Sequence, residues 1–194
     1  MAEAWDRTDL RAEVAGLAGM PVQLLKDTAA ACVAELVGGR GRDIKSFLYL
    51  FVDTFVGGGL VINSHLHSGR HGNAGAVASL PMRLGNTLQS AEQLVSCASL
   101  WELEQRFQAL QLDPHAAYDE RALTPPYVQE TQAWIAKAAN ALAHSIVSGT
   151  AFLDVDAVVI DGSFTRTLLS LVIAQTTAAL AHYNWGGLWP TSIV

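Results

Sequence analysis

Three consecutive glycines, Gly57, Gly58 and Gly59, are the feature around which this 194-residue sequence is organised. They separate two apolar runs of β-forming residues, at 47–52 and 60–62, which we expect to be buried strands. Because glycine has no Cβ, the backbone between the runs can turn tightly or approach a ligand closely. Exposed N–H groups at such a turn bind anions such as phosphate. A glycine-rich hairpin without a ligand is the more frequent outcome, so both interpretations stay open.

Asp27 is the second candidate for chemistry, because it lies between two predicted elements. Residues 21–25 are predicted to form a short strand, and residues 28–37 a helix that ends at Gly38 and Gly39. A carboxylate at this position is well suited to cap the helix that follows. Lys26, immediately before it, has three open interpretations: a partner for Asp27, a partner for an anionic ligand, or a solvated surface lysine.

A polar loop with three histidines, His65, His67 and His71, follows the glycines. In an extended segment His65 and His67 would lie on one side, so metal ligation is conceivable. No carboxylate or cysteine stands near them in sequence, and we therefore favour solvated histidines and predict no metal site.

Composition bounds the class of protein. Hydrophobic residues make up 51% of the chain and charged residues 15%, which is typical of a folded, rather apolar protein with a buried subunit interface, here a homodimer. The net charge of −6 argues against direct nucleic-acid binding. Cys32 and Cys97 offer no disulfide framework, and neither a signal peptide nor a bilayer-length apolar run is evident. We therefore expect a cytoplasmic protein without a membrane partner.

The remaining periodicity predicts an alternation of helices and strands. A helix over residues 10–17 is expected after Thr8 and Asp9, and further helices over 87–110, 127–149 and 164–182. A buried strand over 157–160 ends at Asp161 and Gly162. The helices between residues 87 and 149 include an alanine-rich face, and we expect them to form much of the dimer interface.

The glycine pattern resembles the ROK family, which groups sugar kinases with sugar-responsive transcriptional repressors. Its phosphate-loop pattern, roughly G-T-G-I-G-x-G-I, is echoed by residues 53–60, and its sugar motif G-x-x-G-E-x-G-H falls on residues 72–79. The resemblance implies that Asp27 corresponds to the kinases' general base. The implied phosphate-loop residues are Thr54, Gly57, Gly58 and Gly59, the sugar-site residues are Lys26, Asp27, Gly72, Asn73, Gly75, Ala76 and Ser79, and the nucleotide-side residue is Gly162.

Several side chains depart from the family pattern. Lys26 replaces an asparagine that contacts sugar, Ala76 and Ser79 replace a glutamate and a histidine, and Phe55 replaces a glycine. The loss of polar partners weakens discrimination among sugars, and Asp53 places a carboxylate beside a phosphate site. Only Cys97 lies where the family has a zinc-binding cysteine cluster, so we predict that structural zinc is absent.

The resemblance implies an α/β fold of the actin-like ATPase (ribonuclease H-like) type, a mixed sheet with packed helices. Residues 1–194 would form a single partial C-terminal lobe, truncated at both ends and without a helix-turn-helix. We expect an effector-binding and dimerisation module of a ROK-type regulator that binds a small sugar and is catalytically inactive. One alternative is a kinase that transfers phosphate from Mg-ATP to a hexose, and another is a structural remnant without a ligand.

Overall fold

A five-stranded mixed sheet forms the centre of the molecule, which we describe from a computed structural model over residues 7–82 and 92–194. The strand order is β3-β2-β1-β4-β5. The strands are β1 (Phe47–Val52), β2 (Val56–Ile62), β3 (His65–Leu66), β4 (Ala157–Gly162) and β5 (Ser192–Ile193). The α-helices are α2 (Leu10–Ala18), α3 (Asp27–Gly38), α4 (Val95–Ala98), α5 (Leu100–Ala109), α6 (Val128–Leu153) and α7 (Arg166–Leu180). The mixed sheet with packed helices confirms the predicted architecture.

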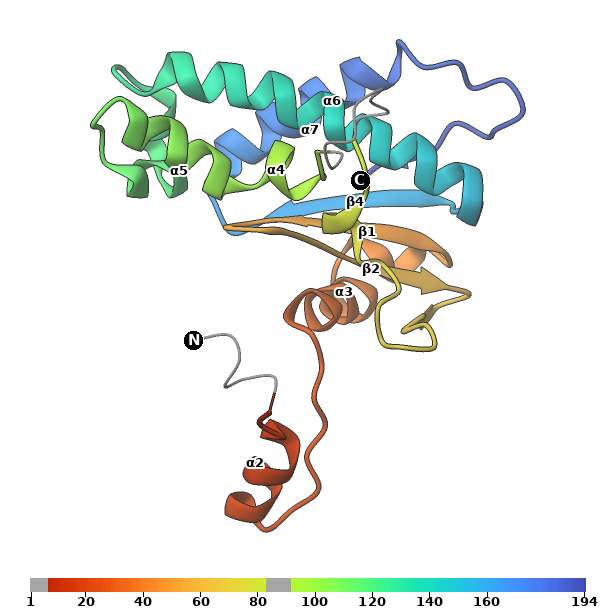
Figure 1. The fold of residues 1–194 in the computed structure, drawn as a ribbon. Coiled ribbons are helices and arrows are strands. Elements are labelled where there is room, and N and C mark those ends of the chain that lie inside the picture. Colours follow the sequence, from red (N-terminus) through yellow and green to blue (C-terminus); the bar gives the residue numbers. More distant parts are fainter. Residues whose placement is uncertain (1–6, 83–91) are drawn as a thin grey trace.

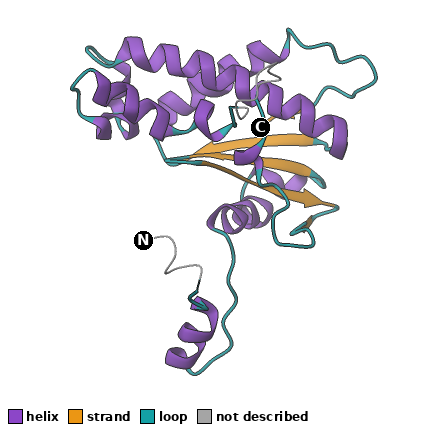
Figure 2. Ribbon diagram, viewed as in Figure 1, coloured by secondary structure: helices purple, strands orange, loops and turns teal. Residues whose placement is uncertain are grey.

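Strand β1 is buried on both faces, and its alternation divides the core in two. Phe47 and Tyr49 point to one side, where they pack with Cys32 of α3. Leu48 and Leu50 belong to the larger core on the other side, which α4 to α7 cover. Figures 1 and 2 show the resulting layers, with α3 beneath the sheet and α6 and α7 above it. Because both faces are covered, the strand is a continuous apolar run rather than an alternating one.

The register of the sheet places three strand ends together. Strand β1 pairs antiparallel with β2 and parallel with β4, so Val52 lies between Val56 and Gly162. The tight connection from β1 to β2, residues 53–55, therefore emerges beside the carboxyl end of β4. In open α/β sheets ligands commonly bind at such an edge.

The N-terminal segment differs in part from its prediction. Helix α2 begins where expected: the Asp9 carboxylate accepts the Ala12 N–H at 3.0 Å, and Gly19 ends the helix with φ 66°. The predicted strand at residues 21–25 is wrong, because these residues pair with no strand and form an extended connection to α3. In Figure 1 this connection runs along one side while α2 lies apart from the sheet.

The helix predicted over residues 87–110 is interrupted. Residues 83–91 lie outside the described part of the chain, and the remainder forms α4 and α5, separated at Ser99. Ser99 has extended backbone torsions, and its hydroxyl accepts the Glu102 N–H at 3.3 Å, so it ends one helix and caps the next. By contrast, α6 and α7 confirm the two later helices, with Trp134, Leu142 and Ile146 fully buried.

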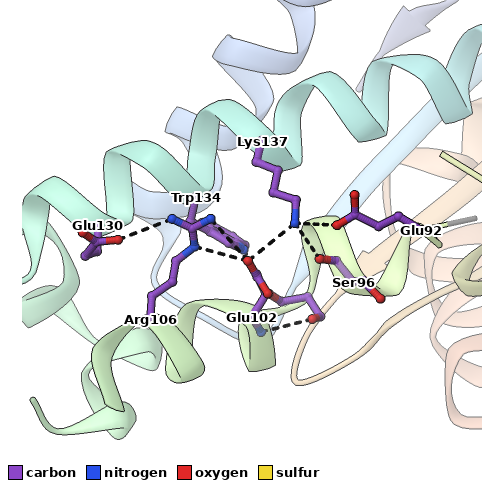
Figure 3. A network of polar contacts seen from close by, with 8 residues as sticks. Glu92, Ser96, Glu102, Arg106, Glu130, Trp134 and Lys137 are labelled. Carbon is purple, nitrogen blue, oxygen red and sulfur yellow. Dashed lines mark hydrogen bonds and ion pairs between the residues drawn. The ribbon is translucent and has the colours of Figure 1, made fainter. Parts of the chain in front are cut away.

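A polar network joins α4, α5 and α6, on the face of the sheet opposite α3 (Figure 3). The Lys137 ammonium donates to Glu92 at 2.7 Å and to the Ser96 carbonyl at 3.0 Å, and it lies 3.5 Å from Glu102. Arg106 bridges Glu102 and Glu130 at 3.3 Å each. The network fixes α5, whose first residues hold the β1–β2 connection described below.

In the described ranges no helix has the length and apolarity needed to cross a bilayer.

Candidate functional site

A cavity of about 850 Å³ opens between the start of α3, the β1–β2 connection and the loop after β3. Its size is within the range of sites for small molecules. Most of the predicted site residues line it, although they are spread over some fifty positions of the sequence. The predicted residues along its wall are Lys26, Asp27, Thr54, Gly57, Gly58, Gly59, Gly72, Gly75 and Ala76.

The three central glycines do not form the turn that the sequence suggested. They lie in β2 and pair with Tyr49, Leu50 and Phe51 of β1, while the turn is formed by residues 53–55. Their small size instead admits close packing of neighbouring elements on the strand. A Cβ on Gly57 would strike the Thr28 side chain.

Gly58 and Gly59 show the same close packing on the two faces of β2. A Cβ on Gly59 would lie 2.6 Å from Cys32 Cβ, and one on Gly58 would lie 2.8 Å from the Gly75 carbonyl oxygen. The glycines therefore bring α3 and the loop that contains Gly75 close to the strand, and so bring both against the cavity.

Asp27 is the first residue of α3, with Lys26 as its N-cap residue. One Asp27 carboxylate oxygen accepts the Thr28 N–H at 2.7 Å. This contact fixes the carboxylate at the helix start, where the helix dipole favours a negative charge. The Lys26 ammonium donates to the side-chain oxygen of Asn73 rather than to Asp27. The bond joins the start of α3 to the loop after β3, two of the three walls of the cavity.

The loop after β3 supplies the sugar-motif positions. Gly72 and Gly75 have φ of 68° and 77°, a region that residues with a Cβ rarely occupy. Gly75 also lies so close to β2 that a Cβ on it would be 2.7 Å from Gly59 Cα. Both glycines are therefore required by backbone geometry, in agreement with the preserved glycine skeleton. The cavity wall also includes His67, Ser68 and His71 from this loop.

The β1–β2 connection is held in place from outside the sheet. The N–H groups of Leu100 and Trp101, at the start of α5, donate to the carbonyls of Asp53 and Thr54 at 2.9 and 3.1 Å. The Thr54 hydroxyl lies 2.7 Å from the Tyr118 hydroxyl. Burial raises the pKa of Tyr118, so its phenol stays protonated across the physiological range.

Two N–H groups of this connection are already bonded within it. The Asp53 N–H donates to the Phe55 carbonyl at 3.0 Å, and the Thr54 N–H donates to the Asp53 carboxylate at 2.6 Å. A phosphate at this turn would have to displace that carboxylate. Phe55, which is 61% exposed, lines the cavity.

Three predicted positions lie apart from the cavity wall. Ser79 ends a short 3₁₀ turn and is exposed, and Asn73 reaches the site only through Lys26. Gly162 ends β4 beside Val52 and packs under Phe164. Cys97 is a buried core residue. Within residues 7–82 and 92–194, no three histidine, cysteine or acidic side chains are placed to hold a metal ion.

Sequence reasoning missed several residues of the site. Thr28, Ser68 and the leucines of the extended connection, Leu24 and Leu25, line the cavity without belonging to any motif. Tyr118 lies 64 positions from its partner Thr54, and no local pattern predicts such a contact. Only the three-dimensional packing reveals these residues.

Comparison with known proteins identifies relatives of this chain by sequence and by fold. The model of the ROK family matches residues 2–188. The N-acetylmannosamine kinase of Vibrio vulnificus (strain YJ016) is 31% identical over 157 residues, which are 79% of this chain and 53% of that protein. The ROK hexokinase of Thermus thermophilus has a TM-score of 0.71 at 22% identity, over 94% of this chain and 64% of that one. A ROK transcriptional regulator, a homologue of the E. coli MLC protein, has a TM-score of 0.65 at 17% identity, over 89% and 46%.

The fold is thus the α/β fold of the actin-like sugar kinases. The chain belongs to the ROK family. It spans about half the length of the curated relatives that it matches.

Proposed function

We propose that this chain is the sugar-binding part of a ROK sugar kinase, corresponding to the C-terminal lobe of such enzymes. The observation that carries the proposal is the position of Asp27, whose carboxylate is bonded to the Thr28 N–H at the wall of a cavity that the β1–β2 connection also lines. Relatives named as N-acetylmannosamine kinases support the same reaction and suggest an amino sugar or hexose as the acceptor. This proposal replaces the regulator module that the altered motifs suggested as the first choice.

In the proposed reaction Asp27 acts as the general base. Its carboxylate takes the proton from the attacking sugar hydroxyl as the new O–P bond forms to the γ-phosphorus of ATP and the bond to ADP breaks. Only one hydrogen bond from the described residues reaches this carboxylate, from the Thr28 N–H, which leaves the second oxygen for the sugar. The Lys26–Asn73 contact would hold the two walls around the acceptor.

A second candidate is the effector-binding and dimerisation module of a ROK-type regulator, without phosphate transfer. One observation favours it: the Thr54 N–H is bonded to the Asp53 carboxylate, so the connection offers a negative charge where a phosphate would bind. Sugar binding is common to both candidates, while nucleotide turnover belongs to the kinase alone. The homodimer, with an interface on the helices between residues 87 and 149, and the cytoplasmic location stay predictions.

The test is sugar binding and ATP turnover measured on the same preparation. Isothermal titration with N-acetylmannosamine, glucose and mannose detects binding, and a coupled assay detects ADP release with Mg-ATP. The kinase proposal predicts binding of one of these sugars and ADP release that depends on it. Binding without sugar-dependent ADP release would favour the regulator module, and no binding at all would contradict both.

A further inference from the structure

Phe55 is a large apolar side chain that is exposed to solvent, on a turn whose backbone is anchored by hydrogen bonds. The residue is 61% exposed, and it stands on the tight β1–β2 connection at the edge of the central sheet. The residues before it are anchored on three sides, by the N–H groups of Leu100 and Trp101 and by the Tyr118 hydroxyl. An exposed ring on an immobilised turn has lost backbone freedom without gaining burial in return.

Phe55 lines a cavity whose other walls carry both polar and apolar groups. The start of α3 contributes Lys26 and Asp27 to its lining, and the loop after β3 contributes Ser68 and His71. The floor between them is the glycine backbone of β2. An exposed aromatic side chain that shares a cavity with hydrogen-bonding groups fits a ligand with an apolar face and a hydroxylated rim. A pyranose ring has this shape, because its C–H bonds gather on one face while its hydroxyls project around the edge.

We propose that Phe55 is the platform on which the apolar face of the sugar ring packs, and that it selects cyclic sugars over open-chain polyols. The inference rests on the proposed function, since it requires that the cavity bind a sugar. It adds a specificity-determining contact at a position where the family pattern has glycine, which offers no ring. Aromatic rings contribute affinity through buried area and a defined stacking geometry. The same polar groups without the ring would bind a polyol and a pyranose alike.

The experiment compares three forms of the chain: unmodified, Phe55→Ala and Phe55→Tyr. Dissociation constants are measured by isothermal titration for N-acetylmannosamine, glucose, the open-chain hexitol mannitol and Mg-AMPPNP. Trp189→Ala is the matched control, because Trp189 is also an exposed aromatic, 82% accessible, but does not line the cavity. Circular dichroism verifies that each variant is folded.

The expected result is a dissociation constant for the preferred cyclic sugar that rises about three- to tenfold in Phe55→Ala, stays near the original in Phe55→Tyr, and is unchanged in Trp189→Ala. Mannitol should bind weakly to every form. Equal affinity of Phe55→Ala and the unmodified chain would overturn the platform while leaving the proposed function intact. Absence of binding by the unmodified chain would overturn both. A variant that loses affinity for Mg-AMPPNP but not for sugar would assign the ring to the nucleotide and overturn this inference.

Discussion

The Thr54 hydroxyl lies 2.7 Å from the Tyr118 hydroxyl, and this bond connects the edge of the cavity to the helical layer above the sheet. Thr54 belongs to the connection between β1 and β2, and Tyr118 ends the 3₁₀ turn Pro114–Tyr118 that follows α5. Together with the two N–H groups at the start of α5, it fixes the turn from which Phe55 projects. The helical layer therefore positions the site without lining it.

Removal of the Tyr118 hydroxyl should weaken this anchor. In Tyr118→Phe the half-buried Thr54 hydroxyl loses its partner, and we expect a loss of about 1 kcal/mol of unfolding free energy. Urea denaturation followed by circular dichroism measures it. Tyr183→Phe is the control, because the Tyr183 hydroxyl has no hydrogen-bond partner among the residues that the structure describes. Equal stability of the two variants would contradict the anchoring role.

Gly59 should not tolerate a side chain. An alanine there would place its Cβ 2.6 Å from Cys32 Cβ and 2.7 Å from Cys32 Sγ, and such overpacking costs about 1–3 kcal/mol. The denaturation midpoint of Gly59→Ala should therefore fall. In the control Gly16→Ala, the new Cβ on the exposed helix α2 meets no atom within 4 Å, so the midpoint should not fall. A Gly59→Ala protein as stable as the original would show that α3 does not pack so closely on β2.

The sequence predicted the regular elements well, because they depend on local patterns. The apolar run at residues 47–52 was sufficient to predict β1. The Asp9 cap predicted the start of α2, and the helical period predicted α6. The role of the glycines was not predictable, since a glycine run fits a turn and a close helix contact equally, and the choice depends on Thr28 and Cys32 from a distant helix.

The candidate site was predicted in outline only. The positions of Asp27 and of the loop glycines followed from the family pattern, and both line the cavity. The break between α4 and α5 depends on the Ser99 cap, which a continuous helical period conceals. Contacts between distant residues, such as Lys26 with Asn73, have no local signal at all.

The network around Lys137 should contribute more to stability than an exposed ion pair. The Lys137 side chain is 32% accessible, and its ammonium reaches Glu92, Glu102 and the Ser96 carbonyl. Lys137→Met should therefore cost about 1 kcal/mol, because it removes a cation that two partly buried carboxylates, Glu92 and Glu102, share. Arg166→Met is the control, since Arg166 is 76% exposed and its pair with Asp161 should contribute little. Equal losses in the two variants, measured by urea denaturation, would contradict a cooperative network.

Both cysteines should be unreactive while the chain is folded. Burial raises the pKa of Cys32 and of Cys97 to about 11, so the reactive thiolate is scarce at pH 8. Their ordinary pKa is about 8.5, so between that pH and 11 the unfolded chain releases these protons and the folded chain retains them. Unfolding free energy should therefore fall as pH rises through this window.

Thiol titration with a chromogenic disulfide measures the reactivity of the cysteines. Urea denaturation at pH 8, 9 and 10 measures the fall of unfolding free energy with pH. A Cys32→Ala, Cys97→Ala double variant should show a smaller decline of stability with pH. Reaction of the native thiols at pH 8 as fast as in denaturant would contradict their burial.

The central claim is that Asp27 accepts the proton of a sugar hydroxyl, and its most direct test is phosphate transfer from labelled ATP in Asp27→Asn. The unmodified chain should phosphorylate N-acetylmannosamine or a hexose. A general base contributes about 10²–10⁴-fold, so the variant should lose at least a hundredfold in turnover while its sugar dissociation constant changes little. Turnover by Asp27→Asn at the original rate, or sugar binding by the unmodified chain without any phosphate transfer, would contradict the account.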